Sequence, residues 1–302
     1  MSAARQDTLQ RVTPWAEAGI TPACSFQVFG MRRSGNHAII DWLMRNAPDA
    51  ASGGVFYNNC RFGKNPLRAY GSLDVYDAEH DLQPHKDIPD AERIAVAGGA
   101  PMVIVSYEDR MPQPPGARQK ASDGFAGGDF NHQILIYRSF LNWTASMLAK
   151  LKKNAGYGIT DRMRIMTLAM NGYIEGLDRV GQAKGITAIC YDDWMKSQDV
   201  RAGVLAQLGL PARDLARGTV RRYGGGSSFQ GKGTAAEDLG STDRDAAMAG
   251  DVEYLLLLWT AAHDLRFMER LMPHFEQDAL RLVALAETAA LNITLPNREA
   301  NP

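Results

Sequence analysis

The chain has 302 residues, 45% of them hydrophobic, which is typical of a globular protein with a substantial buried core. Its formal net charge is −1, so it lacks the overall basic field that drives nonspecific nucleic-acid binding. No apolar run reaches the roughly 18 residues needed to cross a bilayer, the N-terminus has no signal-like apolar core, and the three cysteines show no metal-ligand spacing. We therefore expect a cytoplasmic protein with no membrane span, nucleic-acid partner or required metal.

Residues 1–22 predict a polar lead-in, and residues 23–295 a single α/β domain. The apolar run "FQVF" at residues 26–29 predicts a strand, and apolar residues at helical spacing over 38–44 predict a helix. Residues 50–100 are rich in Gly, Asn, Asp and Pro, so irregular structure with short helices is expected there.

Three later apolar runs predict buried parallel strands, at residues 101–109, 132–138 and 186–194. Helical patterns follow at 139–154, 161–182 and 199–211, with a helical C-terminal part at 251–291. Glycine-rich loops are expected at 111–129 and 223–234. Strands that alternate with helices predict a three-layer α/β fold with a doubly wound parallel sheet.

In such a sheet, ligands bind at the carboxyl ends of the strands. The residues that can carry chemistry fall at these positions. Residues 30–37 follow the first strand, Glu108 follows the next, and Arg138 follows the third. Their places in the fold predict one shared site.

The segment "GMRRSG", residues 30–35, has the G-x-x-x-x-G spacing of a phosphate-binding loop, whose backbone N–H groups form an anion nest. Arg32 and Arg33 can each fork onto two oxygens of a phosphate or sulfate. Asn36 and His37 stand where a magnesium-dependent nucleotide triphosphatase carries Lys and then Ser or Thr. The loop therefore suits an anion that binds without magnesium. A simple glycine turn with solvated arginines is the alternative.

In the stretch "ILIYRSFLNWTAS", Arg138 ends a strand and Ser146 follows eight residues later, within the next helix. At this point the chain, over about residues 25–232, resembles the PAPS-dependent sulfotransferases, as a divergent member of bacterial type. The resemblance implies a P-loop NTPase-like sulfotransferase fold. It also implies in-line transfer of the sulfuryl group of PAPS (3′-phosphoadenosine 5′-phosphosulfate) to a hydroxyl or amine acceptor, which releases 3′,5′-diphosphoadenosine.

In that family the loop binds the 5′-phosphosulfate, and the strand-ending Arg with the later Ser binds the 3′-phosphate. The resemblance implies cofactor-binding roles for these residues of the two anchors: Arg32, Arg33, Ser34, Gly35, Asn36, His37, Arg138 and Ser146. The segments "CYDDWM" and "LGLP" follow in the family's order. A basic, glycine-containing loop that covers the 3′-phosphate and adenine corresponds to residues 221–229, and implies contacts from Arg222, Gly225, Ser227 and Ser228.

Transfer also needs a base that takes the proton of the acceptor. The expected base is Glu108, just past a central strand. Because neighbouring side chains of a strand point to opposite faces, only one of Glu108 and Asp109 is expected to enter the cleft. His37 is the alternative base, and Arg33 is expected to stabilise the leaving oxygen. Asn58 and Asn59 are candidate contacts for the acceptor.

Two other functions fit parts of the sequence. A divergent P-loop kinase or NTPase would use "VIVSYED" as a metal-binding acidic strand, but it does not explain Arg138 with Ser146. A non-enzymatic nucleotide-binding module would bind the same ligand without turnover. The acceptor, whether a small molecule, a carbohydrate or a lipid, and the oligomeric state stay open at this level.

Overall fold

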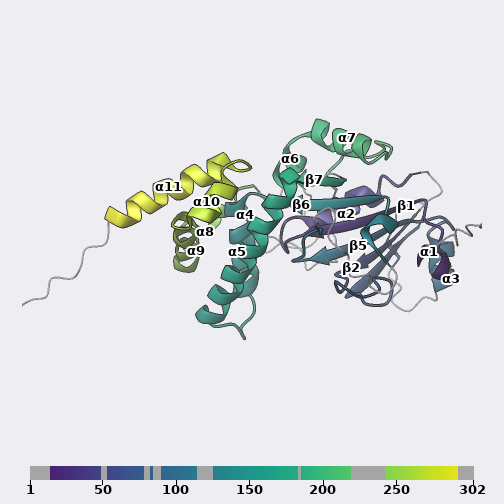
Figure 1. Ribbon diagram of the computed structural model, residues 1–302, viewed down its shortest axis with the longest axis horizontal. Coiled ribbons are helices and arrows are strands. Elements are labelled where there is room, and N and C mark those ends of the chain that lie inside the picture. Colours follow the sequence, from purple (N-terminus) through teal and green to yellow (C-terminus); the bar gives the residue numbers. More distant parts are fainter. Residues whose placement is uncertain are drawn as a thin grey trace, which may run out of the picture.

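The computed structural model describes residues 14–48, 53–77, 82–83, 90–113, 125–182, 185–218 and 242–291. These residues form an α/β fold around one seven-stranded sheet, with the strand order β4-β3-β2-β5-β1-β6-β7 (Figure 1). The strands are β1 Cys24–Gly30, β2 Gly54–Asn58, β3 Ser72–Tyr76, β4 Leu82–Gln83, β5 Met102–Glu108, β6 His132–Tyr137 and β7 Ile186–Cys190.

The helices alternate with the strands in the first part of the chain and follow one another in the last part. They are α1 Pro14–Glu17, α2 Asn36–Met44, α3 Asp90–Val96, α4 Phe140–Lys152, α5 Ile159–Gln182, α6 Tyr191–Lys196, α7 Gln198–Gln207, α8 Arg244–Met248, α9 Val252–Ala262, α10 Leu265–Leu271 and α11 Glu276–Leu291. The helical C-terminal part predicted from residue 251 is therefore confirmed. Among the described residues, no helix has the length and apolar character that a membrane crossing requires.

The sheet is parallel at its centre and antiparallel at one edge. Strands β2, β5, β1, β6 and β7 run parallel, while β3 is antiparallel to β2, and β4 to β3. The prediction of an α/β sheet is confirmed. For residues 50–100, the short helix α3 bears out part of the prediction, but irregular structure is wrong where the segment forms β2, β3 and β4. Strands β2 and β3 each have five residues and give little periodicity, and β3 carries the buried Asp74 in its middle.

The two faces of the sheet are covered by different helices. On one face, Phe26 and Val28 of β1 pack in a core with residues of α2, α6 and α7. On the other face, Phe29 packs in a core with Trp15 of α1 and with residues that follow α3. Trp15 and Ile20 are buried, so the structure corrects the prediction of a polar lead-in for residues 14–22. Both side chains belong to the core on the second face of the sheet.

The segment predicted as a strand over residues 186–194 divides into two elements. Strand β7 ends at Cys190, and helix α6 begins at Tyr191. Asp192 and Asp193 lie in the first turn of α6, where the positive end of the helix dipole stabilises carboxylates. The prediction that these acids end the strand is therefore wrong.

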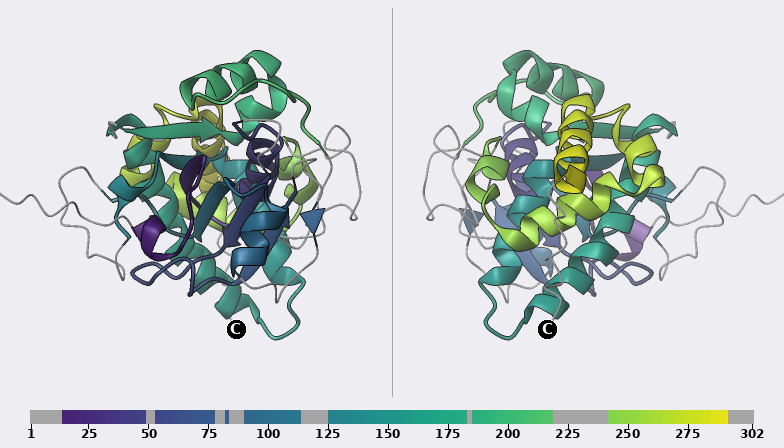
Figure 2. Two further views of the ribbon diagram at one scale, coloured as in Figure 1. Left: turned by 90° about the vertical axis from the view of Figure 1, so that its right-hand side faces the viewer. Right: turned by 90° about the vertical axis from the view of Figure 1, so that its left-hand side faces the viewer.

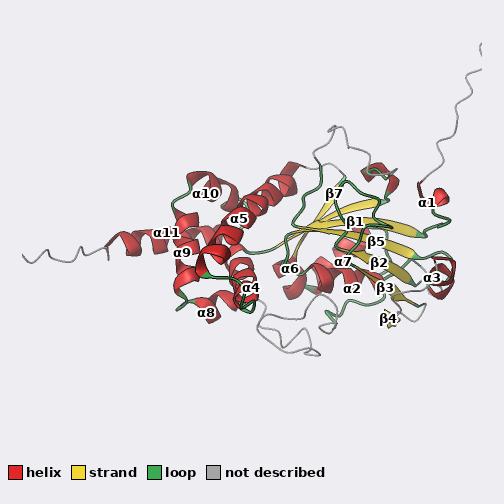
Figure 3. Ribbon diagram, turned by 90° about the horizontal axis from the view of Figure 1, so that it is seen from below, coloured by secondary structure: helices red, strands yellow, loops and turns green. Residues whose placement is uncertain are grey.

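Helices α4, α5 and α8–α11 form a separate helical layer at one end of the sheet (Figures 1 and 3). Their core includes Trp143, Tyr173 and Phe267, and it takes in Met31 from the loop after β1. Viewed along the long axis, the yellow and light-green C-terminal helices cover this end, and the strands are seen from the opposite end (Figure 2). The helical layer therefore lies against the edge of the sheet where the parallel strands end.

Candidate functional site

The direction of winding changes between β1 and β6, which are parallel neighbours. The chain leaves β1 toward β2 on one side of it, and leaves β6 toward β7 on the other side. Open α/β sheets bind ligands in the crevice at such a point, outside the carboxyl ends of the strands. Residues 31–35 follow β1 and Arg138 follows β6, so the topology brings the two predicted anion anchors together.

The loop after β1 depends on two residues in the left-handed region, Arg33 at φ 72° and Gly35 at φ 93°. A Cβ atom at Gly35 would lie 2.1 Å from Cδ2 of Tyr191, so glycine is required by space as well as by conformation. Ser34 is buried, and its N–H donates to the carbonyl of Met31 at 3.2 Å. These features make a tight turn that leads directly into α2.

Side chains from three elements hold the carbonyl groups of this loop. Asn36 Nδ2 donates to the carbonyl of Met31 at 3.2 Å, and Trp143 Nε1 donates to the carbonyl of Arg32 at 3.0 Å. Arg138 Nη1 donates to the carbonyl of Arg33 at 3.2 Å. The loop is thus held by α2, α4 and the end of β6 before any ligand binds, which lowers the cost of ordering it on binding.

The backbone N–H groups of Gly35, Asn36 and His37 have no hydrogen-bond partner among the described residues. They lie at the start of the nine-residue helix α2, where N–H groups point out of the helix and the helix dipole is positive. Three consecutive donors at a helix N-terminus form a binding place for one anionic group.

Three arginines form a positive cluster around Ser146, which is fully buried in α4. Arg33 Nε lies 3.4 Å from Ser146 Oγ, and Arg244 Nη1 lies 2.6 Å from it. Arg138 is 1% exposed and repels both of the other guanidiniums. Burial and this repulsion lower the pKa of Arg33, and they lower the pKa of Arg244 to about 9. An anion bound in the cluster would relieve this repulsion.

No sequence motif marks Arg244 as a site residue. It lies beyond the segment in which the resemblance placed the basic loop, and no motif surrounds it. The fold brings it to the site because α8 packs against α4, where the N–H of Arg244 donates to Asn142 Oδ1 at 2.9 Å. Of the predicted loop residues, Arg222, Gly225, Ser227 and Ser228 lie outside the described residues.

Helix α6 contacts both predicted anchors. The ring of Tyr191 contacts the loop at Gly35, and its centroid lies 5.0 Å from the guanidinium carbon of Arg138. Asp192 accepts a 2.7 Å hydrogen bond from the N–H of Ser139, and its other oxygen lies 3.9 Å from Arg138 Nε. The segment "CYDDWM" therefore positions the arginine at the end of β6 and the start of α4.

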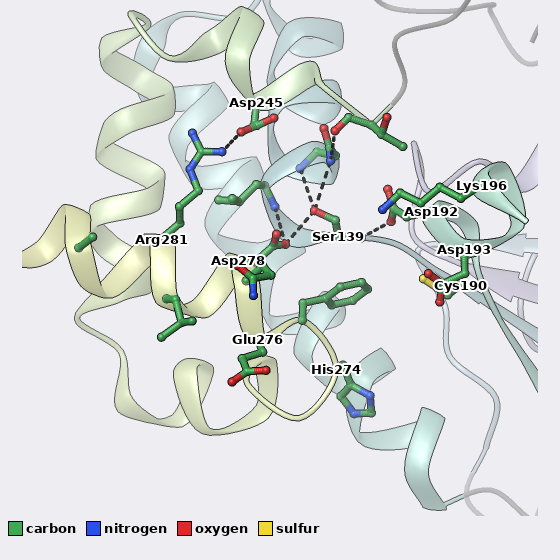
Figure 4. Close-up of a pocket in the computed structure, with 17 residues that line it drawn as sticks. Ser139, Cys190, Asp192, Asp193, Lys196, Asp245, His274, Glu276, Asp278 and Arg281 are labelled. Carbon is green, nitrogen blue, oxygen red and sulfur yellow. Dashed lines mark hydrogen bonds and ion pairs between the residues drawn. The ribbon is translucent and has the colours of Figure 1, made fainter. Parts of the chain in front are cut away.

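A polar cavity of about 630 Å³ is lined by residues of α4, α6, α8 and α11, and the loop after β1 does not line it (Figure 4). Its buried carboxylates are engaged: Asp278 accepts from Ser139 Oγ at 2.8 Å, Asp245 pairs with Arg281, and Asp192 accepts from the N–H of Ser139. The bonds of Asp278 and Asp192 to Ser139 fix the start of α4, so α11 and α6 support the helix that carries Ser146.

Glu108, the last residue of β5, and Asp109, which follows the strand, have different hydrogen-bond surroundings. Asp109 Oδ1 accepts from the N–H of Arg32 at 2.8 Å, and Asp109 Oδ2 forms an ion pair with the Arg32 side chain. Glu108 is half-buried, and its carboxyl group makes no hydrogen bond or ion pair with another described residue. Burial and the nearby Asp109 raise the pKa of Glu108, while Arg32 and Arg33 oppose that rise.

A hydrogen-bond network joins His37 to the ends of β2, β3 and β5. His37 Nε2 lies 3.3 Å from Asn58 Oδ1, which also accepts from Ser106 Oγ at 3.2 Å. Asn58 Nδ2 donates to Ser72 Oγ at 3.1 Å. Burial lowers the pKa of His37, and Arg33 lowers it further, although the bond with Asn58 opposes this. The imidazole is therefore neutral near pH 7.

The other predicted acceptor contact, Asn59, is exposed, and its N–H donates to Ser106 Oγ at 3.0 Å. Among the residues that the structure describes, no group of three or more His, Cys, Asp or Glu side chains could hold a metal ion. The structure thus brings together Arg33, Arg138 and Ser146, and it pairs Arg32 with Asp109 outside this cluster.

A comparison with models of known protein families finds no match for this chain, and neither does a comparison with curated proteins. The loop after β1, the arginine cluster and the half-buried Glu108 are features of this chain's own sequence and structure.

Proposed function

We propose that the chain is a PAPS-dependent sulfotransferase with a P-loop-like sulfotransferase fold. The observation that carries the proposal is the presence of two anion sites side by side, the N–H groups at the start of α2 and the arginine cluster around Ser146. PAPS presents two anionic groups on one adenosine, a 5′-phosphosulfate and a 3′-phosphate. A ligand with a single phosphate chain would leave one of the two sites without an anion.

Each part of the site has a role in this proposal. The N–H groups of Gly35, Asn36 and His37 bind the phosphosulfate. Arg138 and Arg244, with the hydroxyl of Ser146, bind the 3′-phosphate through charge-assisted hydrogen bonds. Arg33 lies between the two groups, because its side chain reaches Ser146 while its backbone belongs to the loop.

Sulfuryl transfer resembles phosphoryl transfer, which is an in-line displacement through a loose transition state. The acceptor oxygen or nitrogen forms a bond to sulfur while the bond from sulfur to the bridging oxygen of PAPS breaks. Negative charge develops on that oxygen, where Arg33 and the loop N–H groups stabilise it. The acceptor proton passes to Glu108, whose carboxyl has no competing hydrogen bond among the described residues and a raised pKa.

The residues at positions 36 and 37 favour this donor over a magnesium nucleotide. Asn36 Nδ2 donates a hydrogen bond to the carbonyl of Met31, and His37 is hydrogen-bonded to Asn58. Neither residue offers the ammonium group or the metal-binding hydroxyl with which a P-loop NTPase holds its phosphates and magnesium. This difference separates the proposal from the kinase alternative.

The test is calorimetric titration with 3′,5′-diphosphoadenosine in the presence of a metal chelator, beside titrations with ADP and with ATP plus magnesium. The proposal expects binding of the diphosphate without metal, and much weaker binding of the other two nucleotides. Binding that requires magnesium and prefers ATP would support a kinase. Sulfur-labelled PAPS offered to phenols, sugars and lipids then reports turnover. Binding without transfer to any of them would favour a non-enzymatic module.

A further inference from the structure

Residues with strained backbones are gathered at the carboxyl edge of the parallel strands. Among the described residues, three residues other than glycine have φ in the left-handed region: Arg33 after β1 at 72°, Asn59 after β2 at 51°, and Asp109 after β5 at 53°. Such conformations persist only where surrounding contacts hold them, and they concentrate at functional sites. Arg33 is the costliest of the three, because Asn and Asp tolerate this region better than other side chains do.

Asp109 supplies contacts that hold Arg32, the residue preceding Arg33. Its own N–H donates to the carbonyl of Gly30 at 3.0 Å, at the start of the loop. Its Oδ1 accepts from the N–H of Arg32 at 2.8 Å, and its Oδ2 pairs with the Arg32 side chain. Trp143 holds the carbonyl of Arg32 from the opposite side. The backbone of Arg32 is therefore fixed at both of its polar groups.

This clamp controls the direction of the donors that follow it. If the N–H of Arg32 lost its acceptor, the chain could rotate about the bonds next to Arg33 and relax toward the common right-handed region. That rotation would turn the N–H groups at the start of α2 and the guanidinium of Arg33 away from their present positions. Binding would then require the loop to be reordered each time, at a cost in affinity.

We propose that Asp109 is a positioning residue, which holds the loop after β1 in its anion-binding form through the backbone of Arg32. This role rests on the proposed function, because the anion in question is the phosphosulfate of PAPS. It assigns different tasks to two adjacent carboxylates, since Glu108 faces the reaction and Asp109 shapes the loop. The ion pair with the Arg32 side chain is secondary, because that side chain is 49% exposed.

Two substitutions separate the backbone bond from the charge. Asp109→Gly removes both but accepts the left-handed conformation without strain, so the variant is expected to fold. Asp109→Asn removes the charge but keeps an oxygen acceptor for the N–H of Arg32, and Asn tolerates the same conformation. We expect Asp109→Gly to weaken the binding of 3′,5′-diphosphoadenosine about tenfold, the effect of one lost hydrogen bond. Asp109→Asn should stay within about twofold of the wild type.

Calorimetry measures the two affinities, and thermal unfolding without ligand checks that both variants are folded. A purely structural role would lower the melting temperature of Asp109→Gly and leave its affinity unchanged, which would overturn the proposal. Equal loss of affinity in both variants would also overturn it, because the charge would then be the effective part. If the wild-type protein itself fails to bind 3′,5′-diphosphoadenosine, the proposed function is wrong. Normal binding by the wild type and by Asp109→Gly alike removes only the role of Asp109.

Discussion

Arg244 Nη1 donates a 2.6 Å hydrogen bond to Ser146 Oγ, although 98 positions separate the two residues in the chain. The bond joins the C-terminal helices to the helix that directly follows β6. It also places a third guanidinium beside Arg33 and Arg138, in a buried position that lowers the pKa of Arg244 to about 9. Arg138 and Arg33 repel the guanidinium of Arg244, and an anion bound beside them would relieve that repulsion.

Replacing Arg244 should therefore lower affinity for the ligand without lowering stability. Arg244→Gln is expected to weaken the binding of 3′,5′-diphosphoadenosine by about 30-fold or more, as for a buried charged contact. The same change should leave the melting temperature without ligand unchanged or higher, because one of three repelling charges is removed. Arg270→Gln is the control, since Arg270 pairs with Asp178 on the helical layer and should leave affinity unchanged. Wild-type affinity in Arg244→Gln would exclude Arg244 from the site.

Glu108 is expected to determine the acid side of the pH–rate profile. Glu108→Gln should lower kcat by about 100- to 10,000-fold, the usual contribution of a general base. The Glu108→Gln variant should keep the wild-type affinity for 3′,5′-diphosphoadenosine. The base must be ionised, and burial raises the pKa of Glu108 above 4.5, so wild-type activity should fall as pH falls through that raised value. His37→Gln is measured in parallel. If that variant loses the acid limb and Glu108→Gln keeps it, the imidazole is the base.

The turn at Gly35 can be tested against a glycine with the same conformation but open space. Gly35→Ala would place a Cβ atom 2.1 Å from the ring of Tyr191, whereas Gly63→Ala has φ 80° and no heavy atom within 4 Å of its added Cβ. Both variants pay the conformational cost of alanine in the left-handed region, roughly 1 kcal/mol. Gly35→Ala should show a clearly larger drop in melting temperature and should lose donor binding. Equal drops would mean that Tyr191 moves aside easily.

Asp74 should make stability depend on pH in a defined direction. It is buried in β3, and burial raises its pKa from 3.8 to about 6. The unfolded chain releases this proton near pH 3.8 and the folded protein near pH 6, so this contribution to stability falls as pH rises across that window. Above that window the cost reaches about 3 kcal/mol, from roughly two pKa units at about 1.36 kcal/mol each. In urea unfolding, Asp74→Asn should therefore gain more stability at about pH 8 than at about pH 5. An equal gain at both pH values would show that Asp74 does not titrate in this window.

The sequence by itself determined the features that depend on residues close together in the chain. Apolar runs predicted the central strands β1, β5 and β6, because a strand buried on both faces is apolar along its whole length. Glycine spacing located the loop at residues 30–35, and the resemblance to sulfotransferases singled out Arg138 and Ser146 as the predicted second anchor. Strand alternation also predicted that only one of Glu108 and Asp109 enters the cleft, but Asp109 lies beyond the end of β5 at φ 53°, where alternation no longer applies.

Only the tertiary structure decided which distant residues meet. Arg244 reaches Ser146 because α8 packs on α4, and Asp109 reaches Arg32 because β5 lies beside β1 in the sheet. Tyr191 touches both anchors because β7 lies two places from β1 in the sheet, beyond β6, and turns into α6. Local periodicity carries no information on such contacts, because each depends on the relative placement of whole elements. The sequence thus indicated a candidate anion site, and the packing of helices and strands determined which residues lie around it.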